Sequence, residues 1–505
     1  MLLKNGATKE MKLGNMIAYG VGDFFGGGCY AILGLWLMFF YTTYAGLSPM
    51  ETGAILAIAR VFSAVLDPVM GYITDNFYRT KLGQRYGRRG FFFILGIPAM
   101  LVYASLWVSG FGFWYYLITY LAFDIVYSMV IVPYETLAAE MTNDFKVRSK
   151  LTGVRMLFST GAGILAAWVP GLLISTFGEK SPLSFLYMGL IFTCLFSLGT
   201  FILWRFTWER RVEIKGDEPT INFLQDMKRL VIELASTMRV KTFRHHVGMY
   251  TGGFVANDIL GSVFTYFVVF VLMQSSVLAS RTLTIMSIVQ FCFVPIFIRL
   301  CLKIGNGASY KLAQIVFILG VLSFVGIYLF HLNQIVFLIY LAGAIIGIAK
   351  SGIFYICWNI YSFMADVDEV LTGRRREGIF AGIMTFVRKA VQAVALFLVG
   401  VVLEEFGFIS GSTLQSPQAI NGVVTVFFVG TFIFLIFGFL VSLRFKLTQK
   451  NHTTLVNEVE RLKKGGSMAD VDSHTKKVVE DLTGWPYEQN WGNNNVGYDA
   501  RLKHS

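Results

Sequence analysis

The stretch VFSAVLDPVMGYITD, residues 61–75, places an acid inside an apolar segment. Of the six residues that precede Asp67, only Ser63 is polar, and Pro68 follows the acid directly. Burying a carboxylate among apolar side chains is unfavourable unless the acid has a partner or a function. We therefore expect a membrane-embedded helix here whose acid has a functional role.

The composition is that of a helical membrane protein. Hydrophobic residues make up 55% of the 505 residues and charged residues 15%, below the ~25% typical of soluble domains, and the mean hydropathy is +0.61. Apolar runs of about 20 residues, long enough to cross a bilayer as a helix, recur along the chain, whereas a β-barrel would need short alternating strands. We predict an all-α integral membrane protein with twelve transmembrane helices near residues 16–42, 50–73, 90–109, 112–138, 151–176, 183–206, 246–273, 282–300, 310–331, 335–364, 378–403 and 420–444.

Lysines and arginines are distributed unevenly between the two sides of the predicted bundle. Loops and helix ends on the side of the N-terminus carry 26 of them and the C-terminal tail carries 10, whereas the other side has two, Lys180 and Arg281. Because cytoplasmic loops are enriched in positive charge, we expect both termini in the cytoplasm. The formal net charge of +12 is mostly this asymmetry, so we expect no nucleic-acid partner.

The longest polar segment between spans divides the chain into two halves. Residues 1–206 are predicted to form an N-terminal six-helix half, 207–245 a central cytoplasmic loop, 246–446 a C-terminal six-helix half and 447–505 a polar cytoplasmic tail. The loop has the periodicity of an amphipathic helix near 223–240, and we expect the tail to be a helix followed by a poorly ordered end. Two six-helix halves joined by a charged loop are the plan of the major facilitator superfamily, whose substrate lies between the halves near mid-membrane.

Ten charged residues lie at membrane depth, five of each sign. Each is unfavourable against lipid, by roughly 3 kcal/mol at the bilayer centre, so these side chains should face the interior. Their equal numbers favour mutual pairing, and the sequence therefore does not require a strongly charged substrate. The basic residues are Arg60, Arg155, Lys350, Arg388 and Lys389, and the acids are Asp23, Asp67, Asp124, Glu135 and Asp258.

Helical spacing places many of these side chains on shared faces. One stripe is Arg60, Ser63, Asp67 and Gly71; a second is Asp124, Tyr127, Ile131 and Glu135, with Ser128 at its edge; a third is Thr385, Lys389 and Gln392. Ionisable groups inside a membrane are functional by default. The alternative is that they are structural ion pairs that hold the bundle together.

The loop after the second span, GYITDNFYRTKLGQRYGRR (residues 71–89), contains both an acid and several arginines. Its Gly-x-x-x-Asp opening resembles the loop motif of the major facilitator superfamily, in which an acid pairs with basic residues to close the cytoplasmic side. Topology alone accounts for several of the arginines. We predict a cytoplasmic gate formed by Gly71, Asp75, Arg79 and Arg85.

Four motifs resemble those of one transporter family. They are AYGVGDFF (18–25), ARVFSAVLDPVMGYITD (59–75), VPYETLAAEMTNDFKVRSKLTGVRMLF (132–158) and MADVDEVLTGRRREGIFAGIMTFVRKAVQA (364–393). On these motifs the chain resembles the glycoside–pentoside–hexuronide:cation symporter family over about residues 16–445. The resemblance implies uptake by alternating access, driven by sodium ions or protons. The sequence has no Walker loop and no metal-ligand cluster, so we expect neither a primary pump nor an enzyme.

The resemblance also implies roles for single residues. It implies that Asp67 binds the coupling cation, with Arg60 beside it, and that Arg155 contacts the sugar. The residues that it places near the sugar and the cation are Tyr127, Thr385 and Lys389.

The chain departs from the family's melibiose carrier at both ligand sites. That carrier has an aspartate at the position of Ser63 and an asparagine at the position of Leu66, and both help to hold sodium. Two further aspartates that bind its sugar correspond here to Gly27 and Ile131. The departures weaken the expectation of melibiose as substrate and of a complete sodium site.

We predict that protons, rather than sodium ions, drive transport. Sodium needs several hard oxygen ligands, whereas the local groups are one carboxylate and one hydroxyl. A single buried carboxylate can carry a proton because burial disfavours its charged form. The predicted coupling residues are Asp67, Ser63, Arg60, Lys389 and Thr385. Sodium is the alternative if a cage is completed by Asp23, Ser128 or Thr385. We expect no other cofactor and no metal site, since the five cysteines lack metal-ligand spacing.

A sugar needs convergent polar groups and flat aromatic surfaces. The predicted substrate-binding residues are Arg155, Tyr127, Asp124, Glu135, Asp23, Trp358 and Asn359, with Tyr30 beside them. Glu135 would supply an acceptor unless it forms a structural salt bridge with Arg155 or Arg60. Arg155 or Lys389 could accept a substrate carboxylate, which includes hexuronides among the candidates.

The sequence as a whole predicts a monomeric importer of a sugar, glycoside or hexuronide. We expect it in the lipid bilayer of the plasma membrane, the inner membrane of a Gram-negative bacterium. One alternative is a carrier of an amphiphile such as a lysolipid, which would need an apolar side opening between helices. Another is a non-transporting sensor, but Asp67, Arg155 and Lys389 favour a coupled transporter.

Overall fold

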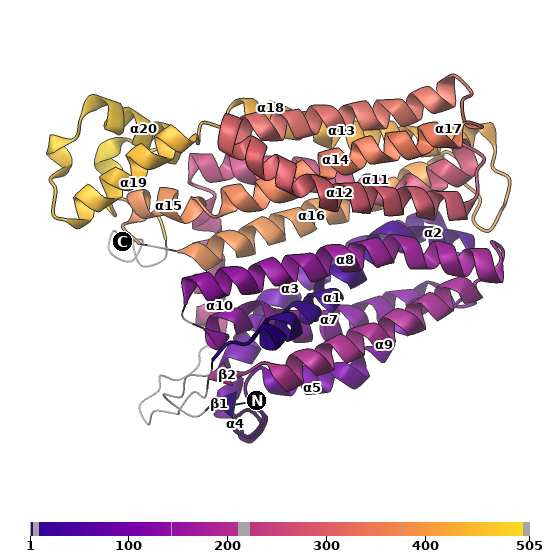
Figure 1. The fold of residues 1–505 in the computed structure, drawn as a ribbon, viewed down its shortest axis with the longest axis horizontal. Helices are drawn as coiled ribbons and strands as arrows, with labels where there is room; N and C mark the ends of the chain where they lie inside the picture. The colour runs from indigo at the N-terminus through magenta and orange to yellow at the C-terminus, as the bar shows by residue number, and fades with distance from the viewer. Residues whose placement is uncertain (1, 4–9, 143, 211–222, 375, 498–505) are drawn as a thin grey trace.

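The computed structural model describes residues 2–3, 10–142, 144–210, 223–374 and 376–497. Two helical bundles lie side by side, with their helices along the long axis of the molecule (Figure 1). The N-terminal half consists of α1 (Leu13–Ile32), η1 (Leu33–Leu37), α2 (Met38–Thr43), α3 (Pro49–Asn76), η2 (Phe77–Arg79), α4 (Lys81–Tyr86), α5 (Gly90–Ala99), α6 (Leu101–Ser105), α7 (Phe113–Met141), α8 (Phe145–Phe177) and α9 (Leu183–Phe206).

The C-terminal half follows a short connecting region. In that region β2 (Glu209–Arg210) pairs in parallel with β1 (Leu2–Leu3), and α10 (Phe223–Thr237) follows. The half itself consists of α11 (Lys241–Tyr266), η3 (Phe267–Val271), α12 (Ser276–Ile304), α13 (Asn306–Leu329), α14 (Val336–Tyr361), α15 (Met364–Thr372), α16 (Glu377–Glu405), α17 (Pro417–Thr425), η4 (Val426–Gly430) and α18 (Thr431–Leu443). We call the end of the molecule that carries α4, α10 and the tail the basic end, and the other end the opposite end (Figure 1).

The all-helical prediction is confirmed. In the described part of the chain, 11 helical segments are long and apolar enough to cross a membrane, and a shorter apolar segment, Gly90–Ser105, occupies the place of the third predicted span. This segment is divided into α5 and α6 at Met100, two residues after Pro98. Proline interrupts helices because it lacks a backbone donor and its ring clashes with the preceding turn. The cytoplasmic placement of both termini stays a prediction.

The sequence sets the start of α3, which carries Asp67. Ser48 accepts a hydrogen bond from the N–H of Glu51 at 3.2 Å, and the Glu51 carboxylate accepts one from the N–H of Ser48 at 2.8 Å. Pro49 occupies the first helical position, where its missing N–H is not needed. This reciprocal cap satisfies two of the unpaired donors at the helix start.

The amphipathic helix predicted near 223–240 is confirmed as α10. It packs against α16. Residues 211–222 of the predicted central loop lie outside the described residues.

The two halves pack against each other along α3–α16 and α8–α12. Between described residues, hydrogen bonds that join a helix of one half to a helix of the other lie at the opposite end or at the level of Asp67. The Tyr266 hydroxyl donates to the Met38 carbonyl at 2.7 Å, and the N–H of Met50 donates to the Glu404 carboxylate at 2.9 Å. The halves are therefore fastened together at the opposite end.

Two glycines allow α3 and α16 to approach each other at the opposite end. A Cβ atom on Gly400 would lie 2.3 Å from the Pro49 carbonyl oxygen and 3.1 Å from the Cα of Gly53. Both neighbours are backbone atoms, which cannot rotate away as a side chain can. The helices therefore pack this closely because both positions lack a side chain.

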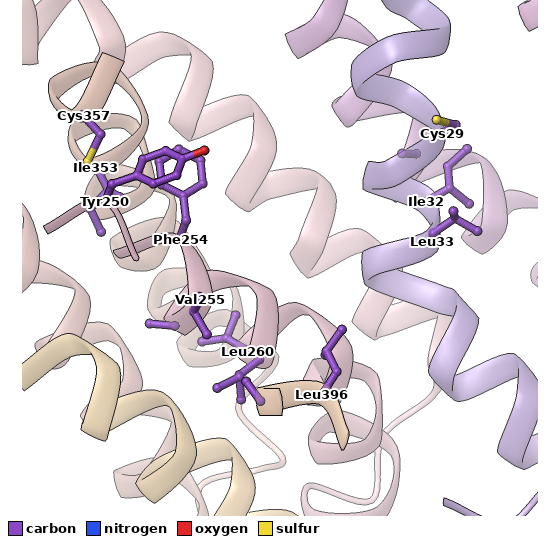
Figure 2. Packing of buried hydrophobic residues seen from close by; sticks show 14 of the residues in the cluster. Cys29, Ile32, Leu33, Tyr250, Phe254, Val255, Leu260, Ile353, Cys357 and Leu396 are labelled. Atoms are coloured by element: carbon purple, nitrogen blue, oxygen red, sulfur yellow. The ribbon is translucent and has the colours of Figure 1, made fainter. Parts of the chain in front are cut away.

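Buried apolar side chains fill each bundle. Figure 2 shows some of these residues close up: Cys29 and Ile32 lie on α1, Leu33 begins η1, and those on α11 and α14 include Tyr250, Phe254, Val255, Ile353 and Cys357. All five cysteines are free; Cys29, Cys301 and Cys357 are buried in this packing, whereas Cys194 and Cys292 are exposed. The buried apolar side chains of both halves form one continuous cluster, and the charged residues at membrane depth lie among it.

The C-terminal tail is folded, and the prediction of a poorly ordered end is wrong as far as residue 497. Its elements are α19 (Gln449–Lys463), η5 (Met468–Asp470), α20 (Ser473–Thr483) and η6 (Tyr487–Gln489), and they pack at the basic end on α15 and α11. The N–H groups of Trp491 and Gly492 donate to the carbonyls of Val370 and Leu371 at 2.8 and 3.0 Å. Residues 498–505 lie outside the described residues.

Apolar packing should anchor this tail. Leu482 of α20 is fully buried, whereas Lys477 on the same helix is exposed. We expect Leu482→Ala to destabilise the tail by about 2–5 kcal/mol, because it leaves a cavity, and Lys477→Ala to cost less than about 0.5 kcal/mol. Thermal unfolding in detergent, followed by tryptophan fluorescence, measures both. Equal midpoints for the two variants would contradict a packed tail.

Candidate functional site

Asp67 lies at the boundary between the two halves. Its Oδ2 accepts a hydrogen bond from Nζ of Lys389 on α16 at 2.5 Å, and its Oδ1 accepts one from the Ser128 hydroxyl on α7 at 2.6 Å. The Lys389 side chain is 11% exposed and that of Asp67 is 30% exposed. Among the described residues, this is the one ion pair between a helix of the N-terminal half and a helix of the C-terminal half. A proton on Asp67 would remove the charge on which that pair depends.

A second polar group lies one helical turn from Ser128. Asp124 on α7 is buried, and its Oδ1 accepts a hydrogen bond from the Tyr30 hydroxyl of α1 at 2.9 Å. The guanidinium of Arg60 on α3 lies 4.3 Å from the centre of the Tyr30 ring, a cation–π distance. Three helices of the N-terminal half thus contribute one side chain each.

Arg155 on α8 forms a third group with two acids. Its Nε donates to Oδ1 of Asp23 at 3.0 Å, and its Nη2 donates to Oε1 of Glu135 at 3.4 Å. Asp23 is buried, whereas the Glu135 side chain is 55% exposed. The salt bridge between Glu135 and Arg155, considered above as an alternative, is present. Asp23 is held by Arg155 and does not join Asp67.

The C-terminal half has an ion pair of its own. Nη2 of Arg388 donates to both carboxylate oxygens of Asp258, at 3.1 and 3.0 Å, and its guanidinium lies 4.7 Å from the centre of the Phe254 ring. Lys350 lines a small cavity of about 40 Å³ between α11 and its neighbours. Arg388 is therefore bound within its own half, whereas its sequence neighbour Lys389 reaches across to the other.

Helices α3, α7 and α16 also carry three other predicted site residues, Ser63, Tyr127 and Thr385. The buried Ser63 hydroxyl donates to the carbonyl of Arg60 on its own helix at 3.3 Å. The Tyr127 hydroxyl donates to the Gly26 carbonyl at 3.2 Å. Thr385 precedes Lys389 by one turn of α16. The hydroxyl that contacts Asp67 is thus that of Ser128, which the sequence placed at the edge of its stripe, and not that of Ser63.

Trp358 and Asn359 lie in the last turn of α14, at the basic end. The Asn359 amide donates to the side chain of Asn306, the first residue of α13, at 2.9 Å. The Trp358 ring packs 6.1 Å from that of Tyr250. The structure does not bring this pair to Asp67, Asp124 or Arg155. Trp358 instead contacts the charged group of the C-terminal half, because the Arg388 guanidinium lies 5.9 Å from the centre of the Tyr250 ring.

The predicted gate has different basic partners. Asp75 is 3.9 Å from Nη2 of Arg89, whereas the guanidinium groups of Arg79 and Arg85 lie over the rings of their neighbours Tyr78 and Tyr86. The Gly71 carbonyl accepts a hydrogen bond from Thr74. Arg89 thus forms the ion pair with Asp75 that we expected from Arg79 and Arg85.

Sequence reasoning missed the acids that hold this arginine pair. Arg88 and Arg89 both form ion pairs with Glu140 of α7, which is buried. Glu209 of β2 accepts a hydrogen bond from the N–H of Arg89 at 2.9 Å, and burial raises the pKa of its carboxyl. Glu140 lies in the motif at 132–158 and is the second-last residue of α7, and an acid at the end of a membrane-spanning helix was the available signal.

Comparisons with known proteins agree with this architecture. The family model described as MFS/sugar transport protein matches residues 18–449. The chain belongs to this family. It is 25% identical to a glucuronide carrier protein homolog of Escherichia coli, over 90% of this chain and 97% of that one. It is 26% identical to the uncharacterized symporter YnaJ of Bacillus subtilis, over 91% and 97%.

The solved structures share the fold of this MFS transporter. An inward-facing, unoccupied bacterial homolog of the human lysosomal transporter Spinster matches with a TM-score of 0.62 at 15% identity, covering 87% of this chain and 100% of that one. The chain is thus a symporter of the major facilitator superfamily, and its curated relatives are named as symporters and sugar-related carriers. It is a transporter of sugar-like small molecules and not an enzyme. It is a multi-pass protein embedded in the lipid of the bacterial inner membrane.

Proposed function

We propose that this symporter carries a sugar, glycoside or hexuronide into the cell together with protons, by alternating access. The observation that supports this most strongly is the position of Asp67. It is a membrane-embedded carboxylate that joins the two halves through Lys389. A coupling ion that binds there acts directly on the contact between the halves.

Protonation would change that contact in a defined way. While Asp67 is ionised, it accepts hydrogen bonds from Lys389 and Ser128 and keeps α3 joined to α16. A proton neutralises the carboxylate, and the lysine loses its counter-ion at a site of low exposure. The halves are then free to separate at this level, and substrate binding determines how they close again.

Proton coupling fits the local ligands better than sodium coupling. A sodium ion needs several oxygen atoms, but the Ser63 hydroxyl is turned toward the Arg60 carbonyl and Asp23 is paired with Arg155. The oxygen atoms around Asp67 are then its own carboxylate and the Ser128 hydroxyl. Sodium is the second candidate, and it would require Thr385 or Asp23 to move toward Asp67.

The contacts between the halves are those of an inward-facing transporter, provided that the basic end is cytoplasmic. Hydrogen bonds such as that between Tyr266 and Met38 fasten the halves at the opposite end. The ion pairs of Arg88 and Arg89 at the basic end stay within the N-terminal half. This state would release substrate to the cytoplasm.

Arg155 supports a hexuronide within this substrate class. Its side chain is 28% exposed, and its longer contact is to the exposed Glu135. A substrate carboxylate could replace Glu135 there while Asp23 keeps the guanidinium in place. The similarity to a glucuronide carrier homolog supports the same substrate class.

Uptake into proteoliposomes tests the coupling ion. With glucuronate as probe, no sodium and an acidic exterior, we expect accumulation of up to about tenfold per pH unit for each proton carried. Dissipating the gradient with a protonophore should end accumulation and leave equilibration. Uptake that requires sodium and ignores the pH gradient would contradict proton coupling.

An apolar groove with exposed side chains such as Val394 and Leu398 supports a second candidate, an amphiphile carrier. It has a volume of about 590 Å³, is lined almost wholly by apolar side chains of α11, α16 and α17–α18, and includes Ala390, next to Lys389. An acyl chain would fit such a surface. Competition of lysophosphatidylcholine with glucuronate uptake, in the same vesicles, distinguishes the two substrates.

A further inference from the structure

Asp124 is a buried acid without a cationic partner. It is 1% exposed, its Oδ1 accepts a hydrogen bond from Tyr30, and its Oδ2 has no hydrogen-bond partner. No ion pair connects it to a lysine, arginine or histidine in the described part of the chain. An ionised carboxylate in this position would be energetically unfavourable, because a buried charge needs an ion-pair partner or several hydrogen bonds. The geometry thus favours a group that can hold a proton.

The nearest cation is engaged with a ring instead of the acid. The guanidinium of Arg60 lies over Tyr30, and its Nε is buried without a hydrogen-bond partner. Asp124 Oδ2 and Arg60 Nε are therefore both buried without a hydrogen-bond partner, and both residues contact Tyr30. The titratable or charged groups around Asp124 are Cys29 and Tyr30 of α1, Arg60 and Asp67 of α3, Tyr120 of its own helix and Lys389 of α16.

Asp124 is linked to the coupling carboxylate through one helix. Ser128 follows it by four residues on α7, a rise of about 6 Å, and the Ser128 hydroxyl donates to Asp67. A movement of α7 that changes the contacts of Asp124 therefore also changes the hydrogen bond between Ser128 and Asp67. Its burial in this state also removes Asp124 from direct contact with substrate, the role that the sequence predicted.

We propose that Asp124 is a second proton-binding group of the coupling mechanism. In this state the proton resides on Oδ2 while Arg60 is stacked on Tyr30. When Arg60 turns from the ring to the carboxylate, the O–H bond breaks, the proton leaves to water and an ion pair forms. The inference rests on the proposed function only in taking protons as the coupling ion.

Infrared spectroscopy of the purified full-length protein tests the proposal without any substrate. The C=O stretch of protonated carboxyl groups is recorded across a pH titration in detergent, in the presence and absence of sodium. We expect the parent to show a buried carboxyl band that Asp124→Asn removes and Asp67→Asn retains. A spectrum of Asp124→Asn that equals the parent's at every pH would overturn the proposal.

Tyr30→Phe provides a second variant, in case Asp124→Asn does not fold. The Tyr30 hydroxyl donates to the carboxylate and so favours its ionised form, and removing it should raise the titration midpoint of this band by about one pH unit. Tyr116→Phe is the matched control, because its hydroxyl donates to the Val108 carbonyl. An unchanged midpoint in Tyr30→Phe would also overturn the proposal.

The two proposals can fail separately. If sodium drives uptake, the vesicle experiment contradicts the proposed function, yet the infrared band of Asp124 is unaffected. If the band is missing while uptake follows the pH gradient, Asp67 is sufficient and the second proton site is wrong.

Discussion

Asp67→Asn is expected to exchange substrate across the membrane but not to accumulate it. Asparagine has the same shape and can still accept a hydrogen bond from Ser128, but it neither binds a proton nor pairs with the charge of Lys389. With glucuronate in vesicles, accumulation should fall to an inside-to-outside ratio of about one, whereas exchange should stay within about tenfold of the parent. Radiolabelled uptake and counterflow measure the two quantities.

Ser63→Ala is the control for this variant. Its hydroxyl bonds to the carbonyl of its own helix, and we expect accumulation to persist when it is removed. Full accumulation by Asp67→Asn would exclude Asp67 as the coupling group. A loss of accumulation in Ser63→Ala would instead indicate that Ser63 is a cation ligand in another state of the cycle, which would favour sodium.

Gly400→Val is expected to block net uptake by preventing closure at the opposite end. Its Cβ would collide with the Pro49 carbonyl oxygen, and neither backbone can give way without separating α3 from α16. Overpacking of this kind costs about 1–3 kcal/mol, enough to shift an equilibrium between two states by about 5- to 150-fold. Uptake should fall accordingly, and the protein should still be inserted in the membrane.

The matched control is Gly163→Val on α8. No atom lies within 4 Å of a Cβ built at Gly163, so uptake should stay within about twofold of the parent. Uptake by Gly400→Val at the level of this control would contradict the role of close helix packing in the inward-facing state. Reduced membrane insertion, checked by immunoblot, would indicate a folding defect instead.

The sequence predicted the helices well because a membrane imposes one strong rule. Apolar runs of the length needed to span a bilayer must be helical, and charges in them must face inward. Those rules led to Asp67, Lys389 and Arg155. They could not predict which hydroxyl bonds to Asp67. That depends on how α7, which carries Ser128, packs against α3, which carries Ser63 and Asp67.

Two features of the structure were beyond the reach of sequence patterns, for different reasons. A helical stripe gives the direction of a side chain but not its contacts with other helices: Asn359, predicted to bind substrate, bonds to Asn306 of α13 in this structure. The tail was assigned too little structure because its composition is polar. Leucines such as Leu455 and Leu482 recur on one face of α19 and α20 and are buried, a signal that overall polarity obscures.

The folded tail also offers a way to follow motion. It is bonded to α15 and α11, so it must travel with the C-terminal half as one body. Lys81 of α4 lies on the N-terminal half at the same end of the molecule. Dyes attached to cysteines introduced at Lys477 and Lys81 would therefore report the distance between the two halves as they move, with neither dye in the transport path.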